Sequence, residues 1–390
     1  MYIIATYNQI ASKGLDCFAR ERFEVGSGLT SPDGILVRSY KILPENLDPN
    51  LKALARAGAG VDKICVDDCT NRGIVVFNTP GANANSVKEL TMLGLLLSTR
   101  GVIKGARFLE ELKATTQDPT EISKTVEQEK KRFAGNEIKG KTLGIVGLGA
   151  IGSLVADMAL SMGMSVLGYD PGLSVESAWR LSNQIQKMDN LPSLLGKADF
   201  VTLHLPMLEA TKDLINKDSI QFFKKGAVLL NFSREGIVDN EAVLKALKAG
   251  ILSRFISDFP TPNLMGREDT IFMPHIGAST QEAEENCAIM ASKQLIDFLE
   301  NGNIVNSVNF PQLYLERLSQ HRIVFANKNI PNMLGQVLPI LAESNLNVLD
   351  MLNKSRGEIA YSVIDVESSI PKETIDKIKG IEGILSARAL

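Results

Sequence analysis

The sequence predicts an α/β protein in which doubly wound parallel sheets are followed by a small βαββαβ domain. Short apolar runs alternate with helical segments through the first 80 residues, and this rhythm restarts at Gly140. A glycine-rich turn follows one of the apolar runs in the second region. After residue 320 the expected order becomes strand, helix, strand, strand, helix, strand. Alternating strands and helices favour parallel sheets, whereas the last order is that of a ferredoxin-like domain.

In the first region, we expect strands at residues 2–5, 23–25, 34–37 and 73–76, and a helix at 44–57 with Leu47, Leu51 and Leu54 on one face. Ser86 and Glu89 form a capping-box pattern, which predicts the start of a long helix that runs from 87 to about 112. Residues 113–135 are polar, so we expect a loosely packed connection with some helix.

In the second region, we expect six strands at residues 142–146, 165–169, 200–203, 227–231, 255–257 and 270–273, with helices between them, including one from 150 and a stretch to about 196. This number of strands matches one Rossmann domain. A further helix is expected at 279–301. The small domain is predicted to have strands at 322–326, 348–353, 360–366 and 385–389, and helices at 333–344 and 372–379.

Composition narrows the functional classes. The chain is 44% hydrophobic and 22% charged with a formal net charge of −3, which argues against nucleic acid or an anionic membrane as the main partner. The longest apolar stretch is too short to span a membrane, and the start MYIIATYN lacks the features of a signal peptide. We therefore expect a cytoplasmic protein. The four cysteines lack metal-ligand spacing, so we expect reduced, packed thiols and no metal site.

The glycine-rich turn predicts a dinucleotide site. Gly147, Gly149 and Gly152 form a GxGxxG pattern between a strand and a helix that opens with Ala150 and Ile151. Such a turn lets the backbone approach a pyrophosphate at the helix N-terminus. Asp170 closes the next strand, where it can accept hydrogen bonds from ribose hydroxyls and repel a 2′-phosphate. This favours NAD, although a lysine or arginine elsewhere could still accommodate NADP.

The whole chain resembles the D-isomer-specific 2-hydroxyacid dehydrogenases. The most specific blocks are GKTLGIVGLGAIG, NFSREGIVD, PHIGAST and VNFP, and the glycine turn lies mid-chain. The resemblance implies a substrate-binding domain at 1–86 and 279–305, an inserted NAD-binding Rossmann domain at 87–278, a linker at 306–320, and an ACT-like domain at 321–390. It further implies oxidation of 3-phospho-D-glycerate to 3-phosphohydroxypyruvate with NAD, the first step of serine synthesis.

Two residues suit that chemistry. His275 is expected to act as acid and base at the substrate hydroxyl, because imidazole exchanges protons near neutral pH. Arg234 follows a predicted strand, and its planar guanidinium can hold a carboxylate through two parallel hydrogen bonds.

The residue that would orient His275 departs from the family pattern. In the family, a glutamate pairs with the histidine five residues after an aspartate that binds the nicotinamide amide. Asp258 matches that aspartate, but the fifth residue is Asn263. We expect Asn263 to act as a neutral orienter; Glu268 and Asp269 are the alternatives. Glu235, in place of the usual glycine, is a departure without a physical explanation.

The resemblance also assigns residues around the cleft. His204 and Pro206 are expected beside the cofactor, with direct substrate contact an alternative for His204. Substrate contacts are expected from Arg38, as the phosphate ligand, and from Ala59, Gly60 and Asn83. Lys88 is either a second cation or a solvated helix residue.

The C-terminal region suggests regulation and assembly. Asn329 and Asn347 match effector positions of the family, so L-serine is a candidate effector, with a structural or assembly role as the alternative. Asn332 replaces a glycine in the effector turn, and asparagine tolerates left-handed geometry. We expect a homodimer or homotetramer paired through the helix after residue 86. The alternatives for the function are a reductase of glyoxylate, hydroxypyruvate or another 2-oxo acid, and a non-catalytic NAD-sensing protein.

Overall fold

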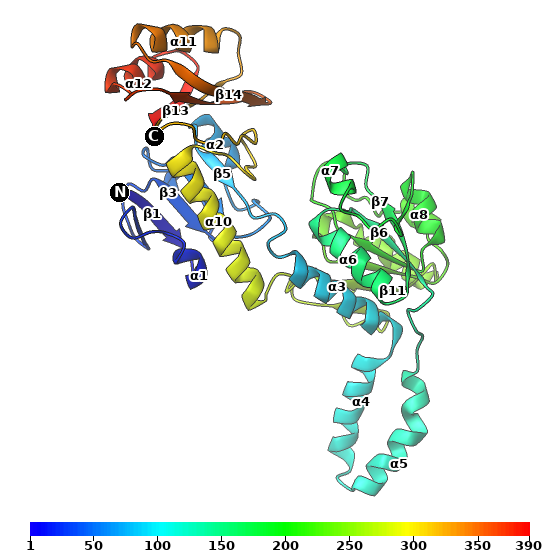
Figure 1. The fold of residues 1–390 in the computed structure, drawn as a ribbon. Coiled ribbons are helices and arrows are strands. Elements are labelled where there is room, and N and C mark those ends of the chain that lie inside the picture. Colours follow the sequence, from blue (N-terminus) through cyan, green and yellow to red (C-terminus); the bar gives the residue numbers. More distant parts are fainter. The chain divides into compact units, whose positions relative to one another are not determined.

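The computed structural model describes the backbone of residues 1–390 and every side chain except that of Glu176. The chain divides into two compact units, shown in Figure 1. Unit 1 comprises Met1–Asn83 and Thr280–Leu390, and unit 2 comprises Ala84–Ser279.

Unit 1 begins with a parallel five-stranded sheet in the order β2-β1-β3-β4-β5. Helix α10, which spans Gln281–Asn301, packs on this sheet and on α1. The helix contact with α1 is close, because a Cβ added at Gly14 would lie 2.5 Å from the Cβ of Ala288. The other elements of this part are β1 (Tyr2–Tyr7), α1 (Ser12–Leu15), β2 (Phe23–Gly26), β3 (Gly34–Val37), η1 (Pro44–Asn46), β4 (Ala53–Arg56), α2 (Val66–Asn71) and β5 (Val75–Phe77).

The helix predicted at 44–57 is wrong. The structure has only a short 3-10 turn at Pro44–Asn46, and Ala53–Arg56 is the buried strand β4. Pro49 explains part of the error, because proline lacks an N–H and disfavours helical geometry in the residue before it. A strand buried on both faces also lacks the alternation that distinguishes strands from helices.

The C-terminal part of unit 1 is an antiparallel sheet in the order β14-β15-β13-β16. The predicted βαββαβ order is confirmed, since the elements are β13 (His321–Lys328), α11 (Met333–Glu343), β14 (Val348–Arg356), β15 (Ile359–Val366), α12 (Lys372–Lys379) and β16 (Ile384–Ala389). Alternate residues of β13 enter different cores. Ile323 and Phe325 pack with α11 and α12, whereas Val324 and Ala326 join the core under α10. Both faces of this sheet are therefore covered within unit 1.

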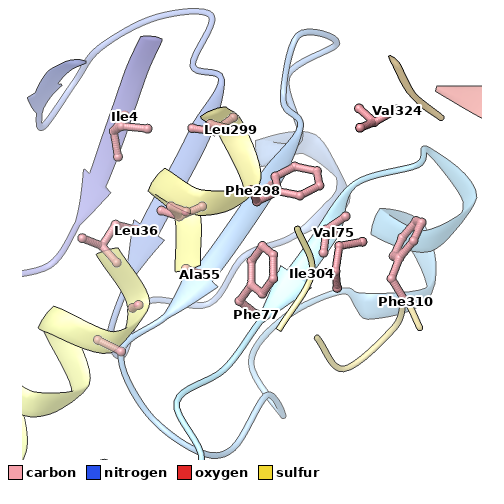
Figure 2. Close-up of a cluster of buried hydrophobic side chains, with 14 of the residues drawn as sticks. Ile4, Leu36, Ala55, Val75, Phe77, Phe298, Leu299, Ile304, Phe310 and Val324 are labelled. Atoms are coloured by element: carbon pink, nitrogen blue, oxygen red, sulfur yellow. The ribbon is translucent and has the colours of Figure 1, made fainter. Parts of the chain in front are cut away.

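The core beneath α10 runs continuously between the two sheets of unit 1. Figure 2 shows Phe77 of β5 close to Phe298 of α10, with Phe310 and Val324 in the same cluster. The Phe77 and Phe298 rings meet edge to face with centroids 5.7 Å apart.

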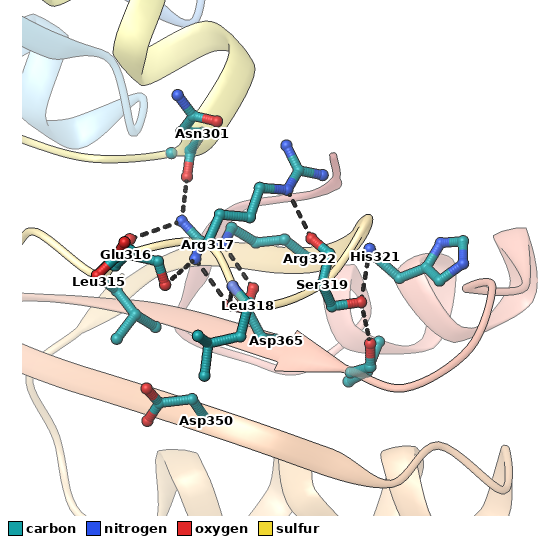
Figure 3. Close-up of polar contacts among 12 residues, drawn as sticks. Asn301, Leu315, Glu316, Arg317, Leu318, Ser319, His321, Arg322, Asp350 and Asp365 are labelled. Atoms are coloured by element: carbon teal, nitrogen blue, oxygen red, sulfur yellow. Dashed lines mark hydrogen bonds and ion pairs between the residues drawn. The ribbon is translucent and has the colours of Figure 1, made fainter.

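A buried ion pair in the C-terminal sheet also binds the segment that connects α10 to β13. Arg322 of β13 and Asp365 of β15 are fully buried and form two hydrogen bonds of 2.6 and 2.8 Å. The remaining guanidinium N–H groups donate to the carbonyls of Asn301, Leu315 and Glu316 (Figure 3). All five donors are thus satisfied, which offsets the desolvation of the two charges.

Unit 2 contains a parallel seven-stranded sheet in the order β12-β11-β10-β9-β6-β7-β8. The six predicted strands are present, and the two-residue strand β8 is an addition within a segment predicted as helical. The bounds are β6 (Thr142–Val146), α6 (Ala150–Ser161), β7 (Ser165–Tyr169), α7 (Val175–Ala178), β8 (Gln186–Lys187), α8 (Leu191–Lys197), β9 (Phe200–Leu203), η3 (Ser219–Phe222), β10 (Ala227–Asn231), η4 (Glu235–Ile237), α9 (Asn240–Lys248), β11 (Leu252–Ser257) and β12 (Thr270–Phe272).

The single long helix predicted from residue 87 is two helices. Helix α3 spans Ala84–Thr99 and packs on α6, while α4 spans Val102–Thr115 after a break at Gly101. The predicted capping box is also wrong, because Ser86 lies inside α3. Helix α4 forms a hairpin with α5 (Pro119–Glu129), followed by η2 (Lys130–Phe133), that projects from the sheet of unit 2 (Figure 1).

The four cysteines are free thiols, as predicted. Within the described residues, no helix has the length and apolar character needed to cross a membrane.

Candidate active site

Most of the predicted catalytic and cofactor residues lie at one edge of the sheet in unit 2. The glycine turn follows β6, Asp170 follows β7, and His204 follows β9. Arg234, Asp258 and His275 come after β10, β11 and β12. All seven strands are parallel, so these segments share the carboxyl edge. The chain reverses direction across the sheet between β6 and β9, which is where such sheets bind ligands.

The glycine turn has the shape that a dinucleotide requires. Gly147 has a φ of +93°, and a Cβ there would lie 2.4 Å from the carbonyl oxygen of His204. A Cβ on Gly152 would lie 2.0 Å from the carbonyl oxygen of Gly147, so only glycine lets α6 start this close to the turn. A Cβ on Gly149 would meet nothing within 4 Å, which leaves the approach to the first N–H groups of α6 open.

Asp170 supports this turn, and its contact with the ribose stays a prediction. One carboxylate oxygen accepts from the N–H of Leu148 at 2.8 Å, and the other accepts from Gly172 at 2.9 Å. The carboxylate is only half-buried and retains lone pairs for a ligand.

Arg234 extends from a tightly bonded turn. The side chain of Asn231, at the end of β10, donates to the carbonyl of Arg234 and accepts from the N–H of Ser233. The Ser233 hydroxyl donates to Leu203 O at 2.7 Å and accepts from Leu205 N at 2.8 Å. The guanidinium itself is half-buried and makes one hydrogen bond, to Ser233 O. Its remaining N–H groups are available for a carboxylate.

His204 is held as a neutral imidazole. Its Nε2 lies 3.0 Å from Thr202 Oγ1, and Nδ1 is buried without a partner among the described residues. Burial lowers the pKa of His204 to about 3. A ring that stays neutral fits a place in the wall beside a cofactor better than proton exchange with a substrate.

His275 sits at the tip of a loop that Asp258 fixes. Its backbone is left-handed, with a φ of +56°. Both carboxylate oxygens of Asp258 are committed here: one accepts from Ile276 N at 2.9 Å and the other from Gly277 N at 2.7 Å. Asp258 is 1% exposed, so its structural role is to lock the His275 loop. Its predicted contact with nicotinamide stays a prediction.

A second element fixes the same loop. Ser86 of α3 donates its hydroxyl to Gly277 O at 2.7 Å in a buried hydrogen bond. The His275 ring is exposed and packs edge to face on Phe259, with ring centroids 4.9 Å apart.

The structure does not place the predicted partner of His275 beside it. Asn263 instead donates to Glu241 at 2.7 Å. The two alternatives are also engaged elsewhere, since Glu268 pairs with Lys104 at 2.7 Å and Asp269 binds Arg267 through two hydrogen bonds. Within the described residues, His275 has no hydrogen-bonded carboxylate or amide partner. Asn263 lies in the turn segment after β11, and its amide donates to the carboxylate of Glu241 on α9 instead.

The predicted substrate residues lie at the carboxyl edge of the sheet in unit 1. Arg38 follows β3, Ala59 and Gly60 follow β4, and Asn83 follows β5 at the end of the first segment. Arg38 donates to Glu284 at 2.6 Å, so its guanidinium is already partly neutralised.

The loop with Ala59 and Gly60 is held through its carbonyl groups. The carbonyls of Gly58 and Ala59 accept from Thr79 N and the Asn78 side chain, respectively. Arg56 donates to the Gly60 carbonyl. Among the described residues, no acceptor faces the N–H groups of Ala59 and Gly60. This leaves two adjacent donors for an anion.

Other sequence predictions have mixed outcomes. Lys88 donates to the side chain of Asn85, and its side chain is 15% exposed, so it is largely covered rather than a solvated helix residue; its role as a second cation stays a prediction. Glu235 is exposed at the start of η4. Asn332 has a φ of +67°, which confirms the expected left-handed turn before α11. Asn329 donates to Gly357 O and Asn347 donates to Glu367, both on the exposed surface.

Sequence reasoning missed the residues that support the site from behind. Arg56 and Asn78 hold the Gly58–Gly60 loop, and Ser86 and Phe259 hold the His275 loop. Only Arg56 carried a signal, as a charge at the end of an otherwise apolar strand. The others are ordinary residue types whose role depends on contacts far apart in the sequence.

Comparison with known proteins identifies the family. Residues 101–277 match the model of the D-isomer specific 2-hydroxyacid dehydrogenase, NAD binding domain. The chain is 34% identical to D-3-phosphoglycerate dehydrogenase of Methanocaldococcus jannaschii over 93% of this chain and 67% of that protein. The same identity is found with D-3-phosphoglycerate dehydrogenase of Haemophilus influenzae, over 88% of this chain and 82% of that protein.

A solved structure agrees with this result. The crystal structure of NAD+-bound 3-phosphoglycerate dehydrogenase from Entamoeba histolytica covers 80% of this chain and 99% of its own, with 27% identity and a TM-score of 0.62. The chain belongs to the D-isomer specific 2-hydroxyacid dehydrogenase family and is an NAD-dependent oxidoreductase. Within this family, the chain is similar over nearly its whole length to members named D-3-phosphoglycerate dehydrogenase.

The residues present fit the dinucleotide. The open approach at Gly149, the free N–H groups at the start of α6 and the half-exposed Asp170 are the features that a pyrophosphate and an adenosine ribose need. When bound, NAD supplies the hydride acceptor.

Proposed function

We propose that this chain oxidises 3-phospho-D-glycerate to 3-phosphohydroxypyruvate with NAD, as the first step of L-serine biosynthesis. The observation that carries the proposal is the 34% identity to a protein named D-3-phosphoglycerate dehydrogenase over 93% of the chain. The arrangement of Arg234 and His275 at the carboxyl edge supports the same reaction class.

In this proposal Arg234 binds the substrate carboxylate and His275 accepts the hydroxyl proton. Arg234 has unused donors in a half-buried setting, which suits a bidentate carboxylate contact. His275 is exposed on a loop fixed by Asp258 and Ser86, so its ring is presented without a carboxylate neighbour. The hydride leaves the carbon as the proton leaves the oxygen, and the ketone forms.

Unit 1 supplies the other contacts in this proposal. The N–H groups of Ala59 and Gly60 and the side chain of Asn83 bind substrate oxygens. Arg38 binds the phosphate, and that contact competes with Glu284 for the same guanidinium. A dianionic phosphate has the larger charge and favours the exchange.

His204 and Pro206 form the wall beside the cofactor. The neutral state of His204 supports a positioning role over a direct role in proton transfer.

The ACT-like identity of the C-terminal domain and its response to L-serine are parts of the same proposal. The β14-β15-β13-β16 order with both helices on one face supports a ferredoxin-like module, and the left-handed Asn332 supports an effector turn beside Asn329 and Asn347. We also propose a cytoplasmic homodimer or homotetramer. Support comes from the exposed apolar side chains Leu93, Leu96, Val102 and Leu109 on α3 and α4.

The test is steady-state NADH formation from 3-phospho-D-glycerate. D-glycerate and glycolate are the matched substrates that lack the phosphate. A parallel assay uses NADP in place of NAD. The proposal expects a kcat/KM for the phosphorylated substrate at least about 100-fold above those for D-glycerate and glycolate, since a phosphate accepts several charge-assisted hydrogen bonds. Preference for glycolate, or for the reduction of glyoxylate, would assign the enzyme to another 2-oxo acid. A fall in turnover with added L-serine tests the effector site in the same assay.

A further inference from the structure

A pocket in unit 1 is lined by several positive charges. It encloses about 490 Å³ between the five-stranded sheet and β16 of the C-terminal sheet. Four cationic side chains line it: Lys52, Arg72, Lys379 and Arg388. No carboxylate is among its lining residues.

The pocket lies at the opposite edge of the sheet from the predicted substrate residues. Lys52 directly precedes β4 and Gly73 precedes β5, which places both at the amino edge. Arg38 and Gly60 follow strands of the same sheet. An occupant of this pocket would therefore bind away from the substrate.

Two of the cations are held in place by protein groups. Lys52 pairs with Asp33, and Arg388 donates to the carbonyls of Phe298 and Leu299 at the end of α10. The Arg388 guanidinium also lies over the Phe298 ring, 4.5 Å from its centroid. Such anchoring fixes where the charges point, which lowers the ordering cost of binding.

The other two cations have spare capacity. Arg72 donates one hydrogen bond from Nη1 to Leu47 O, at 3.0 Å. Lys379 is exposed at the end of α12 and has no ion-pair partner among the described residues. Both therefore retain donors for a ligand.

The positive charge is not cancelled by its surroundings. Asp33 offsets one of the four charges, and the C-terminal ends of α2, α10 and α12 contribute at most about half a negative charge each. With those contributions at their largest, a net of about 1.5 positive charges remains. Apolar side chains such as Phe298 and Val324 (labelled in Figure 2) also line the pocket, which weakens screening by water.

We propose that this pocket binds a phosphate group, either inorganic phosphate or the phosphate of a small ester. Phosphate is the tetrahedral dianion that best matches several convergent lysine and arginine donors. Lys52 and Arg72 come from the first sheet, whereas Lys379 and Arg388 come from the C-terminal domain. A bound phosphate bridges the two and stabilises their packing.

The test is isothermal titration calorimetry of the full-length protein with inorganic phosphate and, separately, glycerol 3-phosphate, at constant ionic strength in chloride. Lys379→Gln is expected to weaken the pocket's Kd by about fivefold, the effect of one partly screened charge, and Lys379→Glu by more. Lys372→Gln, on the same exposed helix but outside the pocket, is the matched control and leaves the Kd unchanged. Tighter binding of the ester would identify an organic phosphate as the occupant.

The active site is a competing phosphate site with Arg38 as its proposed phosphate ligand, so Arg38→Gln is included. Pocket binding is expected to persist in Arg38→Gln. Three outcomes would each overturn the proposal. Binding could disappear in this variant, the affinity could be equal in Lys379→Gln, Lys379→Glu and Lys372→Gln, or neither probe could show saturable binding. These outcomes are independent of turnover with 3-phospho-D-glycerate, so the proposal stands or falls separately from the proposed function.

Discussion

The substitution Asp258→Asn tests how the His275 loop is held. The carboxylate accepts from Ile276 N at 2.9 Å and Gly277 N at 2.7 Å while 1% exposed. An asparagine keeps one acceptor and turns an NH2 group towards the other N–H. The variant therefore loses one charge-assisted hydrogen bond and gains a donor-donor conflict in a buried place.

The expected loss of stability is about 2.5–6 kcal/mol, because a hydrogen bond to a charged group contributes roughly 1.5–3 kcal/mol and a buried unsatisfied donor costs about 1–3. With His275 free to leave its left-handed conformation, kcat is expected to fall by about 100-fold, as misplacement of a reacting group by about 1 Å does.

The assays are urea unfolding followed by circular dichroism, and steady-state NADH formation. Glu268→Gln is the control, because Glu268 is an exposed carboxylate that pairs with Lys104 away from His275. Near wild-type kcat and stability in Asp258→Asn would refute the account of how the loop is fixed, and so would an equal loss in the control.

Three further predictions follow from other contacts. Gly152→Ala places a methyl group 2.0 Å from Gly147 O, so NAD affinity measured by calorimetry is expected to fall by more than about tenfold. Unchanged affinity would contradict the role of the glycine turn in NAD binding. Glu284→Gln removes the carboxylate that competes for Arg38. Because one exposed ion pair is lost, KM for 3-phospho-D-glycerate is expected to fall by about two- to fivefold at similar kcat. A raised KM would exclude Arg38 as the phosphate ligand. Burial favours a raised pKa for Asp365, but hydrogen bonds from Arg322 and from Leu318 N outweigh burial and lower the pKa below 3.8. The stabilisation that the ionised Asp365 gives the folded state is therefore present above about pH 4 and is lost as pH falls through the folded pKa. Asp365→Asn, which strands the buried Arg322, is expected to cost about 3–5 kcal/mol at pH 7 and to flatten the acid limb of a thermal unfolding series; an unchanged acid limb would contradict this.

Local patterns were enough for much of the fold. The apolar run at 227–231 and the GxGxxG turn at Gly147 depend on neighbouring residues, and both are found where the sequence predicts them. The run at 53–56 failed because a strand buried on both faces has no period that separates it from a helix.

In the site, too, some residues could be predicted from the local sequence and others could not. His275 and Arg234 could be chosen from residue type and position after a strand. Ser86 and Asn263 could not be assigned correctly, because Gly277 and Glu241, their actual partners, are 191 and 22 residues away in the sequence. Side-chain pairing across such separations is set by packing, which a spacing rule does not contain.

The most direct test of the central claim is single-turnover NADH formation from 3-phospho-D-glycerate by the wild type, His275→Gln and Arg234→Lys, with NAD binding measured in parallel. The account predicts a loss of about 1,000-fold or more in the rate for His275→Gln and a raised substrate Kd for Arg234→Lys, with NAD affinity unchanged in both. Wild-type rates in His275→Gln, with NAD and substrate bound, would show that another group removes the proton.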